Sequence, residues 1–208
     1  MKTIKLLLAA TLIMVGVSLN AQDNQFTFGV KAGVNMSNMD IKHIDTKVKF
    51  GYNIGVTVDY AINQDWYILS GLQYTTKGTK IDYSIFEAKL NAAYLQLPIH
   101  AGYKLEIAPE TKLVFHAGPY FAYGINGKAK ASTNYFEELE DEWGIEGTGK
   151  SNTFDTIDRF DMGLGLGVGI EFGKFGLDLG WDYGLINIAK EDGTTRNGNA
   201  YLTVGYKF

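Results

Sequence analysis

Residues 159–172 read RFDMGLGLGVGIEF, and every second residue of this stretch is large and apolar. Such alternation predicts a β-strand, because successive side chains of a strand point to opposite faces. The positions between the apolar residues are mostly glycine, namely Gly163, Gly165, Gly167 and Gly169. Glycine weakens a strand whose second face is in water, so a face of glycines indicates crowded surroundings, such as the inside of a narrow closed barrel.

The length of the same stretch is sufficient to cross a membrane. Its fourteen residues extend to about 46 Å, of which a strand tilt of about 40° leaves roughly 35 Å of height. The hydrocarbon core of a bilayer is about 30 Å thick. We therefore expect residues 159–172 to span a bilayer as one strand of a β-barrel.

Seven further segments repeat the alternation, with apolar positions in residues 26–36, 50–60, 66–74, 93–103, 113–125, 175–185 and 202–208. The connections after the second, fourth and sixth segments are short, around Asn63, Ala108 and Gly173-Lys174, and the others are longer. Transmembrane barrels have short periplasmic turns and longer extracellular loops. The pattern predicts an all-β, eight-stranded antiparallel up-and-down transmembrane β-barrel with both chain ends on the periplasmic side.

The turn at Gly173-Lys174 predicts a register. A two-residue turn with glycine first favours type II′. It would pair Phe172 with Phe175 and Gly169 with Asp178, which places the apolar side chains of both strands on one face.

Two prolines conflict with regular strands. Pro98 and Pro119 fall inside the fourth and fifth segments, and a closed barrel has no edge strand to accommodate a missing N–H donor. We expect a bulge or a local break at these positions.

The N-terminus resembles a secretory signal peptide over residues 1–21. Lys2 and Lys5 precede an apolar stretch at residues 6–19, and Ala21 is a plausible last residue before cleavage. Residues 22–208 would then form a single outer-membrane β-barrel domain. Without Lys2 and Lys5 the chain keeps 17 basic and 23 acidic residues, a net charge near −6, which does not favour nucleic-acid binding. The absence of cysteine excludes disulfides and thiolate metal sites.

Alternation alone does not say which face lies inside, and a soluble lipocalin-like binding barrel is also eight-stranded. The glycine-rich polar face and aromatic bands at the segment ends favour the membrane barrel. On that interpretation the interior carries balanced charges that form a paired lumen network, since buried charges need partners. The expected lumen charge network comprises Lys31, Asp59, Lys104, Lys112, Arg159, Asp161, Glu171, Asp178, Asp182 and Lys207.

Four short motifs resemble the PorT-like outer-membrane β-barrel family of Bacteroidetes. They are GVKAGVNMS at residues 29–37, YLQLPI at 94–99, AGPYF at 117–121 and YGLINI at 183–188. The resemblance covers about residues 22–208 and implies the fold and an outer-membrane location. The member that gives the family its name is implicated in protein secretion across the outer membrane, which makes a secretion role one expectation for this chain.

Candidate chemistry is sparse. The sequence contains no GxSxG, HExxH or Walker motif. His100 and His116 face inward on neighbouring segments and would lie opposite each other in a hairpin centred on Ala108, as a metal pair, a proton-transfer pair or a structural hydrogen-bond network. Asp178 and Asp182 share one face of a segment, where Arg159 and Lys31 would be their partners. We expect no catalytic residue, no metal and no cofactor.

The longest connection, residues 127–158, contains the acidic stretch EELEDEW at 137–143. Tyr135, Phe136 and Trp143 flank these charges and are candidate interaction residues, since aromatic side chains commonly anchor interfaces. The alternative is a solvated loop without a binding role.

These observations lead to a function hypothesis with alternatives. The favoured one is a non-enzymatic outer-membrane protein with a side-chain-filled lumen, which acts as a membrane scaffold or interaction protein and as an accessory to protein export or envelope organisation. Its expected partners are outer-membrane lipid and envelope or secretion proteins bound through the long loops, and not nucleic acid. The alternatives are a small porin-like solute channel, the lipocalin-like barrel, and a barrel enzyme that modifies lipids or peptides.

Overall fold

The computed structural model describes residues 25–41, 46–83, 86–132, 149–190 and 193–208. The elements, in chain order, are β1 (Phe26–Ile41), β2 (Thr46–Lys47), β3 (Lys49–Ala61), β4 (Trp66–Tyr83), β5 (Phe86–Ala108), β6 (Thr111–Ser132), β7 (Gly149–Ser151), α3 (Thr153–Thr156), β8 (Phe160–Phe172), β9 (Phe175–Gly184) and β10 (Thr195–Lys207). The expected signal peptide lies outside the described residues. None of the helices within the described ranges has the length and apolar character needed to span a bilayer.

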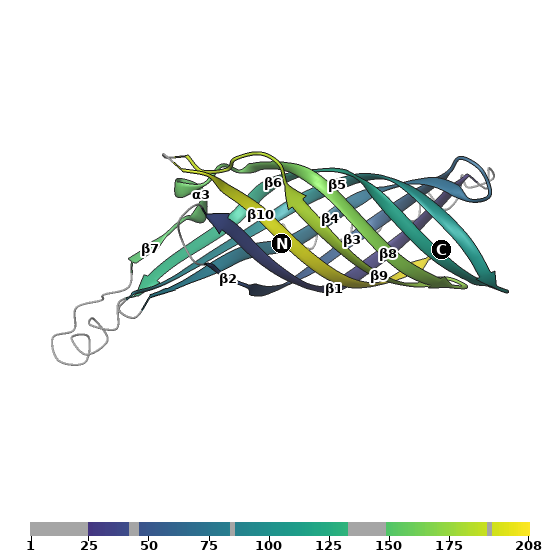
Figure 1. Cartoon of the computed structure of the whole chain (residues 1–208), viewed down its shortest axis with the longest axis horizontal. Coiled ribbons are helices and arrows are strands. Elements are labelled where there is room, and N and C mark those ends of the chain that lie inside the picture. Colours follow the sequence, from purple (N-terminus) through teal and green to yellow (C-terminus); the bar gives the residue numbers. More distant parts are fainter. Residues whose placement is uncertain (1–24, 42–45, 84–85, 133–148, 191–192) are drawn as a thin grey trace, which may run out of the picture.

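Eight of the described strands close into an antiparallel up-and-down barrel (Figure 1). The hydrogen-bonded order runs β1, β3, β4, β5, β6, β8, β9 and β10, and β10 pairs back with β1. The predicted eight-stranded antiparallel barrel is therefore confirmed.

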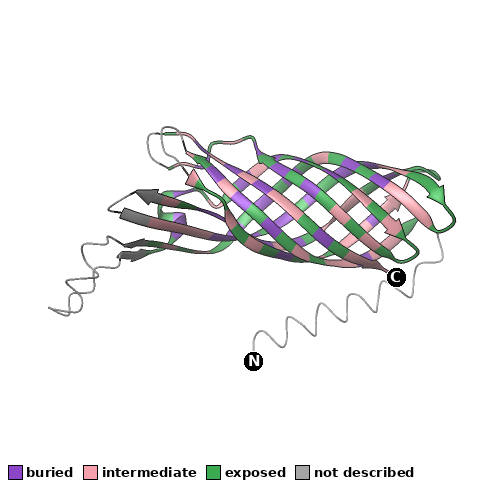
Figure 2. Ribbon diagram, turned by 60° about the horizontal axis from the view of Figure 1, so that its bottom comes forward, coloured by how far each residue is buried: buried purple, intermediate pink, exposed green. Residues whose placement is uncertain are grey.

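Buried and exposed residues alternate along the strands of the barrel (Figure 2). On β8, Phe160, Leu164 and Leu166 are exposed on the outside, while Asp161 and Gly163 are buried inside. The lipocalin-like alternative requires an apolar interior and a polar exterior, so this orientation rules it out.

The glycines of β8 make room for side chains from other strands. A Cβ built on Gly165 would lie 2.8 Å from the ring of His100, and one on Gly167 would lie 2.4 Å from the ring of His116. At Gly163 the nearest obstacles are a neighbouring carbonyl oxygen and the Tyr120 ring. The bare face of RFDMGLGLGVGIEF thus lies against side chains that cross the lumen.

The predicted turn register is confirmed. Phe172 pairs with Phe175 and Gly169 with Asp178. Only Gly173 of the two turn residues has a positive φ, 55°, as a type II′ turn requires.

Pro98 interrupts the ladder without shifting its register. The β5–β6 pairing stops at Pro98 opposite Tyr120 and resumes at Ala101 opposite Ala117 in the same register, and Pro119 falls on the β6 side of this gap. The β4–β5 ladder is also interrupted here, between Ser70–Ile99 and Gln73–Gln96, and the Ser70 hydroxyl of β4 donates to the Pro98 carbonyl oxygen at 2.9 Å. The expected bulge or local break at the prolines is confirmed in the form of a break, while the register shifts lie elsewhere, between Ala93 and Tyr94 and between Glu106 and Ala108.

Strands β4, β5 and β6 extend far beyond the apolar segments that predicted them. They comprise 18, 23 and 22 residues, against 13 in β8 and 10 in β9, and they project past the other strands at the end that carries β2 and β7 (Figure 1). The long loop expected after the third segment was therefore wrong, because most of it is paired strand. Its outward residues on β4, Thr76, Gly78 and Lys80, are not large and apolar, so no apolar alternation marks this part of the strand.

The tight approach of β1 and β10 predicts a position-specific effect of alanine. A Cβ at Gly33 would lie 2.1 Å from the Leu202 carbonyl oxygen, whereas one at Gly205 has no neighbour nearer than 3.4 Å. We expect Gly33→Ala to destabilise the barrel by about 1–3 kcal/mol through overpacking against backbone, and Gly205→Ala to have little effect. Urea titration of the folded fraction in lipid vesicles measures both. Equal effects of the two substitutions would contradict the predicted clash.

Candidate functional site

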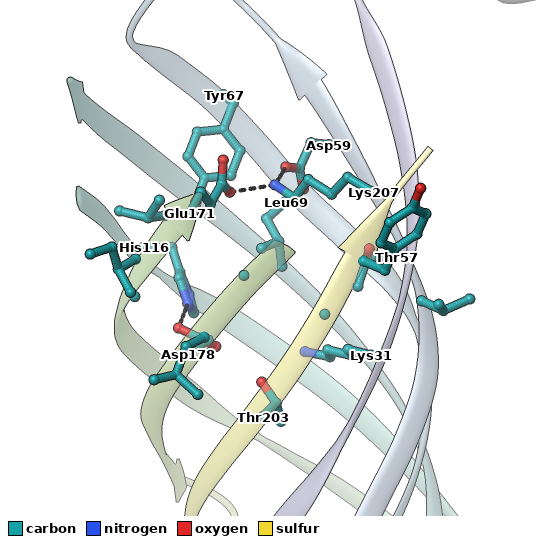
Figure 3. Close-up of a pocket in the computed structure, with 18 residues that line it drawn as sticks. Lys31, Thr57, Asp59, Tyr67, Leu69, His116, Glu171, Asp178, Thr203 and Lys207 are labelled. Atoms are coloured by element: carbon teal, nitrogen blue, oxygen red, sulfur yellow. Dashed lines mark hydrogen bonds and ion pairs between the residues drawn. The ribbon is translucent and has the colours of Figure 1, made fainter. Parts of the chain in front are cut away.

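Four charged residues join four strands near the end of the barrel that holds the short turns. Lys104 Nζ lies 3.2 Å from Asp59 Oδ2 and 3.3 Å from Glu171 Oε2. Lys207 donates to the same two carboxylates (Figure 3). We call these residues the inner ion cluster. Two cations and two carboxylates balance one another there, as partly buried charges require.

A histidine chain lies in the middle of the lumen. His100 Nδ1 is 2.8 Å from His116 Nδ1, and His116 Nε2 is 3.0 Å from Asp178 Oδ1. Asp182 accepts a hydrogen bond of 2.9 Å from Gln96 Nε2. Each of the two carboxylates on β9 thus has its own partner on the opposite wall.

A third layer, farther toward the long loops, surrounds a fully buried ion pair. Lys77 Nζ lies 3.4 Å from Asp161 Oδ2, and both side chains are 0% exposed. Tyr120 and Asn197 donate to the same carboxylate oxygen at 3.2 and 2.9 Å. The Lys77 ammonium also lies 4.5 Å from the centroid of the Tyr120 ring, a cation–π distance.

The short helix α3 covers the outer mouth of the lumen. Asn152 caps it in a capping box with Asp155, and the helix places Phe154 in the barrel, where its ring lies 5.7 Å from that of Tyr94. The Phe154 ring occupies the space that a side chain on Gly124 would need. The residues packed there form the largest described apolar cluster inside the barrel: Met39, Ala92, Tyr94, Tyr120, Ala122, Phe154, Ile157 and Ile188.

A small cavity separates the inner ion cluster from the histidine chain (Figure 3). Its volume is about 70 Å³, enough for a few water molecules. Lys31 points into it and lies 5.8 Å from the centroid of the Tyr201 ring. Among the described residues Lys31 forms no ion pair, although Asp178 and Asp59 line the same cavity.

The structure distributes the ten residues of the expected network unevenly. Asp59, Lys104, Glu171 and Lys207 meet in the inner ion cluster, while Asp161, Asp178 and Asp182 each bond elsewhere, as described above. Lys112 sits opposite Glu171 in the β6–β8 register and has no ion pair among the described residues. Arg159 was expected near Asp178, and this was wrong: its Nη1 donates to the Gly124 carbonyl oxygen at 2.9 Å, and its guanidinium lies over the Phe154 ring.

The histidine register was wrong by two residues although the histidines do meet. The hairpin turns at Pro109 and Glu110, so His116 pairs with Gly102 and not with His100. The two imidazoles are diagonal neighbours that both point inward, and their stacked rings bridge the offset with centroids 5.1 Å apart. The third histidine, His43, lies outside the described residues.

Sequence reasoning missed Lys77, the most buried cation of the lumen. The apolar alternation of the third segment ends at Tyr74, because the next outward positions, Thr76 and Gly78, are not large and apolar. The alternation of side chains along a strand could have identified it: Tyr74 points outward, so Lys77, three residues later, points inward if the strand continues.

The remaining sequence predictions concern the long loop and metal binding. The loop candidates Tyr135, Phe136 and Trp143 lie outside the described residues, as does the acidic stretch between them. In the part of the chain that the structure covers, no group of three or more His, Asp or Glu side chains is arranged to hold a metal ion.

Residues 20–190 match the family described as outer membrane protein beta-barrel domain. The chain belongs to this family. Together with the apolar exterior of the barrel, this membership places the protein in the bacterial outer membrane. No curated protein matches the chain significantly.

Several solved outer-membrane structures are similar to the chain. Ail, the attachment invasion locus protein of Yersinia pestis, is 20% identical, and the match covers 88% of this chain and 99% of that one with a TM-score of 0.42. Neisserial surface protein A is 19% identical over 87% and 97% of the two chains, TM-score 0.45. OprG of Pseudomonas aeruginosa is 11% identical over 88% and 96%, TM-score 0.45.

Lys207 is one of the two cations of the inner ion cluster, and like Lys104 it contacts both carboxylates. We expect Lys207→Met to lower stability by about 2 kcal/mol or more, because Asp59 and Glu171 then repel each other with one cation between them. Lys174→Met, on the adjacent exposed turn, is the matched control and should change little. Urea midpoints of the folded fraction test this, and an unchanged midpoint for Lys207→Met would show that the cluster does not stabilise the fold.

Proposed function

We propose that this protein is a non-enzymatic outer-membrane barrel with a closed lumen, which acts as a membrane scaffold or interaction protein through its extracellular loops. The observation that carries the proposal is the sequence of obstructions along the lumen. The inner ion cluster, the histidine chain, the Lys77–Asp161 pair and Phe154 of α3 follow one another from the periplasmic to the extracellular end.

The small-channel alternative is weakened by the size of the remaining space. Water-filled porins use 16 to 18 strands, whereas eight strands leave room for little more than side chains. The cavity of about 70 Å³ lies between two bonded layers. Enzymatic function is weakened because His116 and Asp182, which are hydrogen-bonded to Asp178 and Gln96, are buried inside the lumen.

The proposed export role, signal peptide and contact residues are supported by the sequence. The motifs at residues 29–37, 94–99, 117–121 and 183–188 resemble the PorT-like family, which supports a role as an accessory to protein export or envelope organisation. Residues 1–21 would act as a signal peptide that directs the chain to the envelope. Tyr135, Phe136 and Trp143 are the residues proposed to contact envelope or secretion proteins.

Planar-bilayer recording tests the closed lumen. We expect the refolded protein to show no steady ohmic conductance, because bonded side chains fill the path and the three layers have no continuous water column. A shift in gel mobility between folded and boiled samples confirms insertion-competent protein, and a 16-stranded porin serves as the positive control. A steady conductance in verified folded protein would make the solute channel the better description.

Site-specific photo-crosslinking in cells tests the interaction role. A photo-reactive amino acid at Trp143 should yield a discrete crosslinked band, because aromatic side chains commonly anchor interfaces and Trp143 is one of the proposed contact residues. The same amino acid at Lys174, on a periplasmic turn, is the control. Absence of a band at position 143, or an identical band at both positions, would count against the proposed loop interaction.

A further inference from the structure

The carboxylate of Asp182 is buried in the middle of the lumen without a cation bonded to it. Asp182 is 2% exposed. Its Oδ2 accepts a hydrogen bond of 2.9 Å from the neutral side-chain amide of Gln96, and it forms no ion pair with any Lys or Arg of the described residues. Burying a charge is unfavourable unless an opposite charge lies near it. The surroundings of Asp182 therefore favour a positive charge that its described neighbours do not supply through an ion pair.

A ring nitrogen without a partner faces the other oxygen of this carboxylate across Gly165. A Cβ built on Gly165 would lie 2.7 Å from Asp182 Oδ1 and 2.9 Å from His100 Nε2, so both atoms border the same small space. His100 is also 2% exposed, and its Nε2 is buried with no hydrogen-bond partner within the described chain. A hydrogen on this nitrogen would be directed toward the carboxylate of Asp182.

The rest of the histidine chain decides which ring nitrogens carry a hydrogen. An ionised Asp178 can only accept, so His116 Nε2 donates to it across 3.0 Å. In a neutral His116 the Nδ1 atom is then an acceptor, and His100 Nδ1 must donate to it across 2.8 Å. A neutral His100 consequently has no hydrogen on Nε2. The uncharged pair thus ends on a lone pair that faces the carboxylate of Asp182.

One additional proton completes the hydrogen bonds of the chain. A proton from the solvent binds His100 Nε2, and the hydrogen on His100 Nδ1 moves across the bond to His116 Nδ1. His116 is then an imidazolium that donates to Asp178 and to His100, while neutral His100 donates toward Asp182. A second proton would leave a hydrogen on both Nδ1 atoms, so the bond between the rings could not form. The chain therefore accommodates one proton and not two.

The charges of the lumen layers give an independent reason for the same proton. The inner ion cluster contains two lysines and two carboxylates, and the Lys77–Asp161 pair contains one of each. In the middle layer the described inward charges are one cation, Lys31, and the two carboxylates Asp178 and Asp182, whose charges both act on Lys31. With one proton on the histidine chain, the middle layer becomes neutral like the other two.

The remaining strands add no charge that would replace this proton. Beside the two histidines, β8 presents Gly165 and Gly167, and β4 places Leu69 opposite His100. Tyrosine side chains are neutral near pH 7, and the inner ion cluster across the cavity is balanced. The titratable groups around the chain, apart from that cluster and the Lys77–Asp161 pair, are Lys31 of β1, Tyr67 of β4, Asp178 and Asp182 of β9, and Tyr201 of β10.

We propose that His100 and His116 form a proton-binding site, which holds one proton between Asp178 and Asp182 in the folded barrel at neutral pH. The site lies inside the lumen, so it is independent of whether the loops bind a partner. Charged and neutral forms of the pair differ in the bonds described above, which makes the stability of the barrel depend on pH.

The direction of this dependence follows from the proton count. Histidine in an unfolded chain titrates near pH 6.5. Above that value the folded barrel holds a proton that the unfolded chain has lost, so stability falls as pH rises through the folded-state titration. Well below it the unfolded chain takes up two protons at these histidines while the folded barrel holds one, so stability also falls toward acid. We expect a maximum close to neutral pH.

Urea titrations in lipid vesicles between pH 6.5 and 8.5 test the proposal on the full folded chain. We expect the unfolding constant of the wild type to rise with pH by up to about tenfold per unit, as release of one proton requires. Asp182→Asn should lose most of this dependence, because its amide can donate to His100 Nε2 and the middle layer is neutral without a proton. Glu110→Gln removes the same charge on an exposed turn and should keep the wild-type dependence. Equal pH dependence in the wild type and Asp182→Asn would overturn the proposal.

Nitrogen-15 NMR of the imidazole rings in detergent micelles observes the proton directly and needs no unfolding. At pH 7 we expect one ring with both nitrogens protonated, His116, and one with a hydrogen on Nε2 alone, His100. His43→Gln removes the signals of the third histidine, and His100→Gln assigns the remaining two. Two neutral rings with the His100 hydrogen on Nδ1, or two charged rings, would overturn the proposal whatever the urea titrations give.

Discussion

The structure depends on one constraint, that backbone N–H and C=O groups in hydrocarbon must be hydrogen-bonded within the chain. Each unpaired group costs several kcal/mol there, and a sheet meets the requirement only by closing on itself. The pairing of β1 with β10 completes the ring. Closure with eight strands sets a small circumference, and that circumference decides what the interior can contain.

A narrow interior explains why glycine and charge occur together. His100, His116 and Tyr120 cross the lumen from β5 and β6, and they fit because β8 presents glycines opposite them. Charged side chains share the same space, and most of them are held by a partner from another strand, as Lys77 is by Asp161. These bonds between distant strands cross-link the barrel, and they are also what fills it.

The outward side chains change from apolar to polar where the barrel wall leaves the membrane. Within the apolar band, outward positions such as Leu95 and Leu166 are large and exposed because lipid surrounds them. Beyond Tyr74 and Tyr123 the same strands continue as a polar ribbon in which Lys80, Lys89 and Lys130 pair in register. The outward side chains there are polar because they lie beyond the apolar band.

The sequence by itself determined the features that depend on local pattern: the alternation that faces Leu166 outward and Gly167 inward, the eight segments, the closed antiparallel order, and the register across Gly173. These follow because side-chain direction and tight-turn geometry are fixed by neighbouring residues. Only the tertiary structure decided that His116 stands opposite Gly102, that Lys77 pairs with Asp161, and that the polar ribbon stays paired. Those outcomes depend on the position of a turn, on bulges that shift parity, and on barrel closure, which brings together strands far apart in the chain.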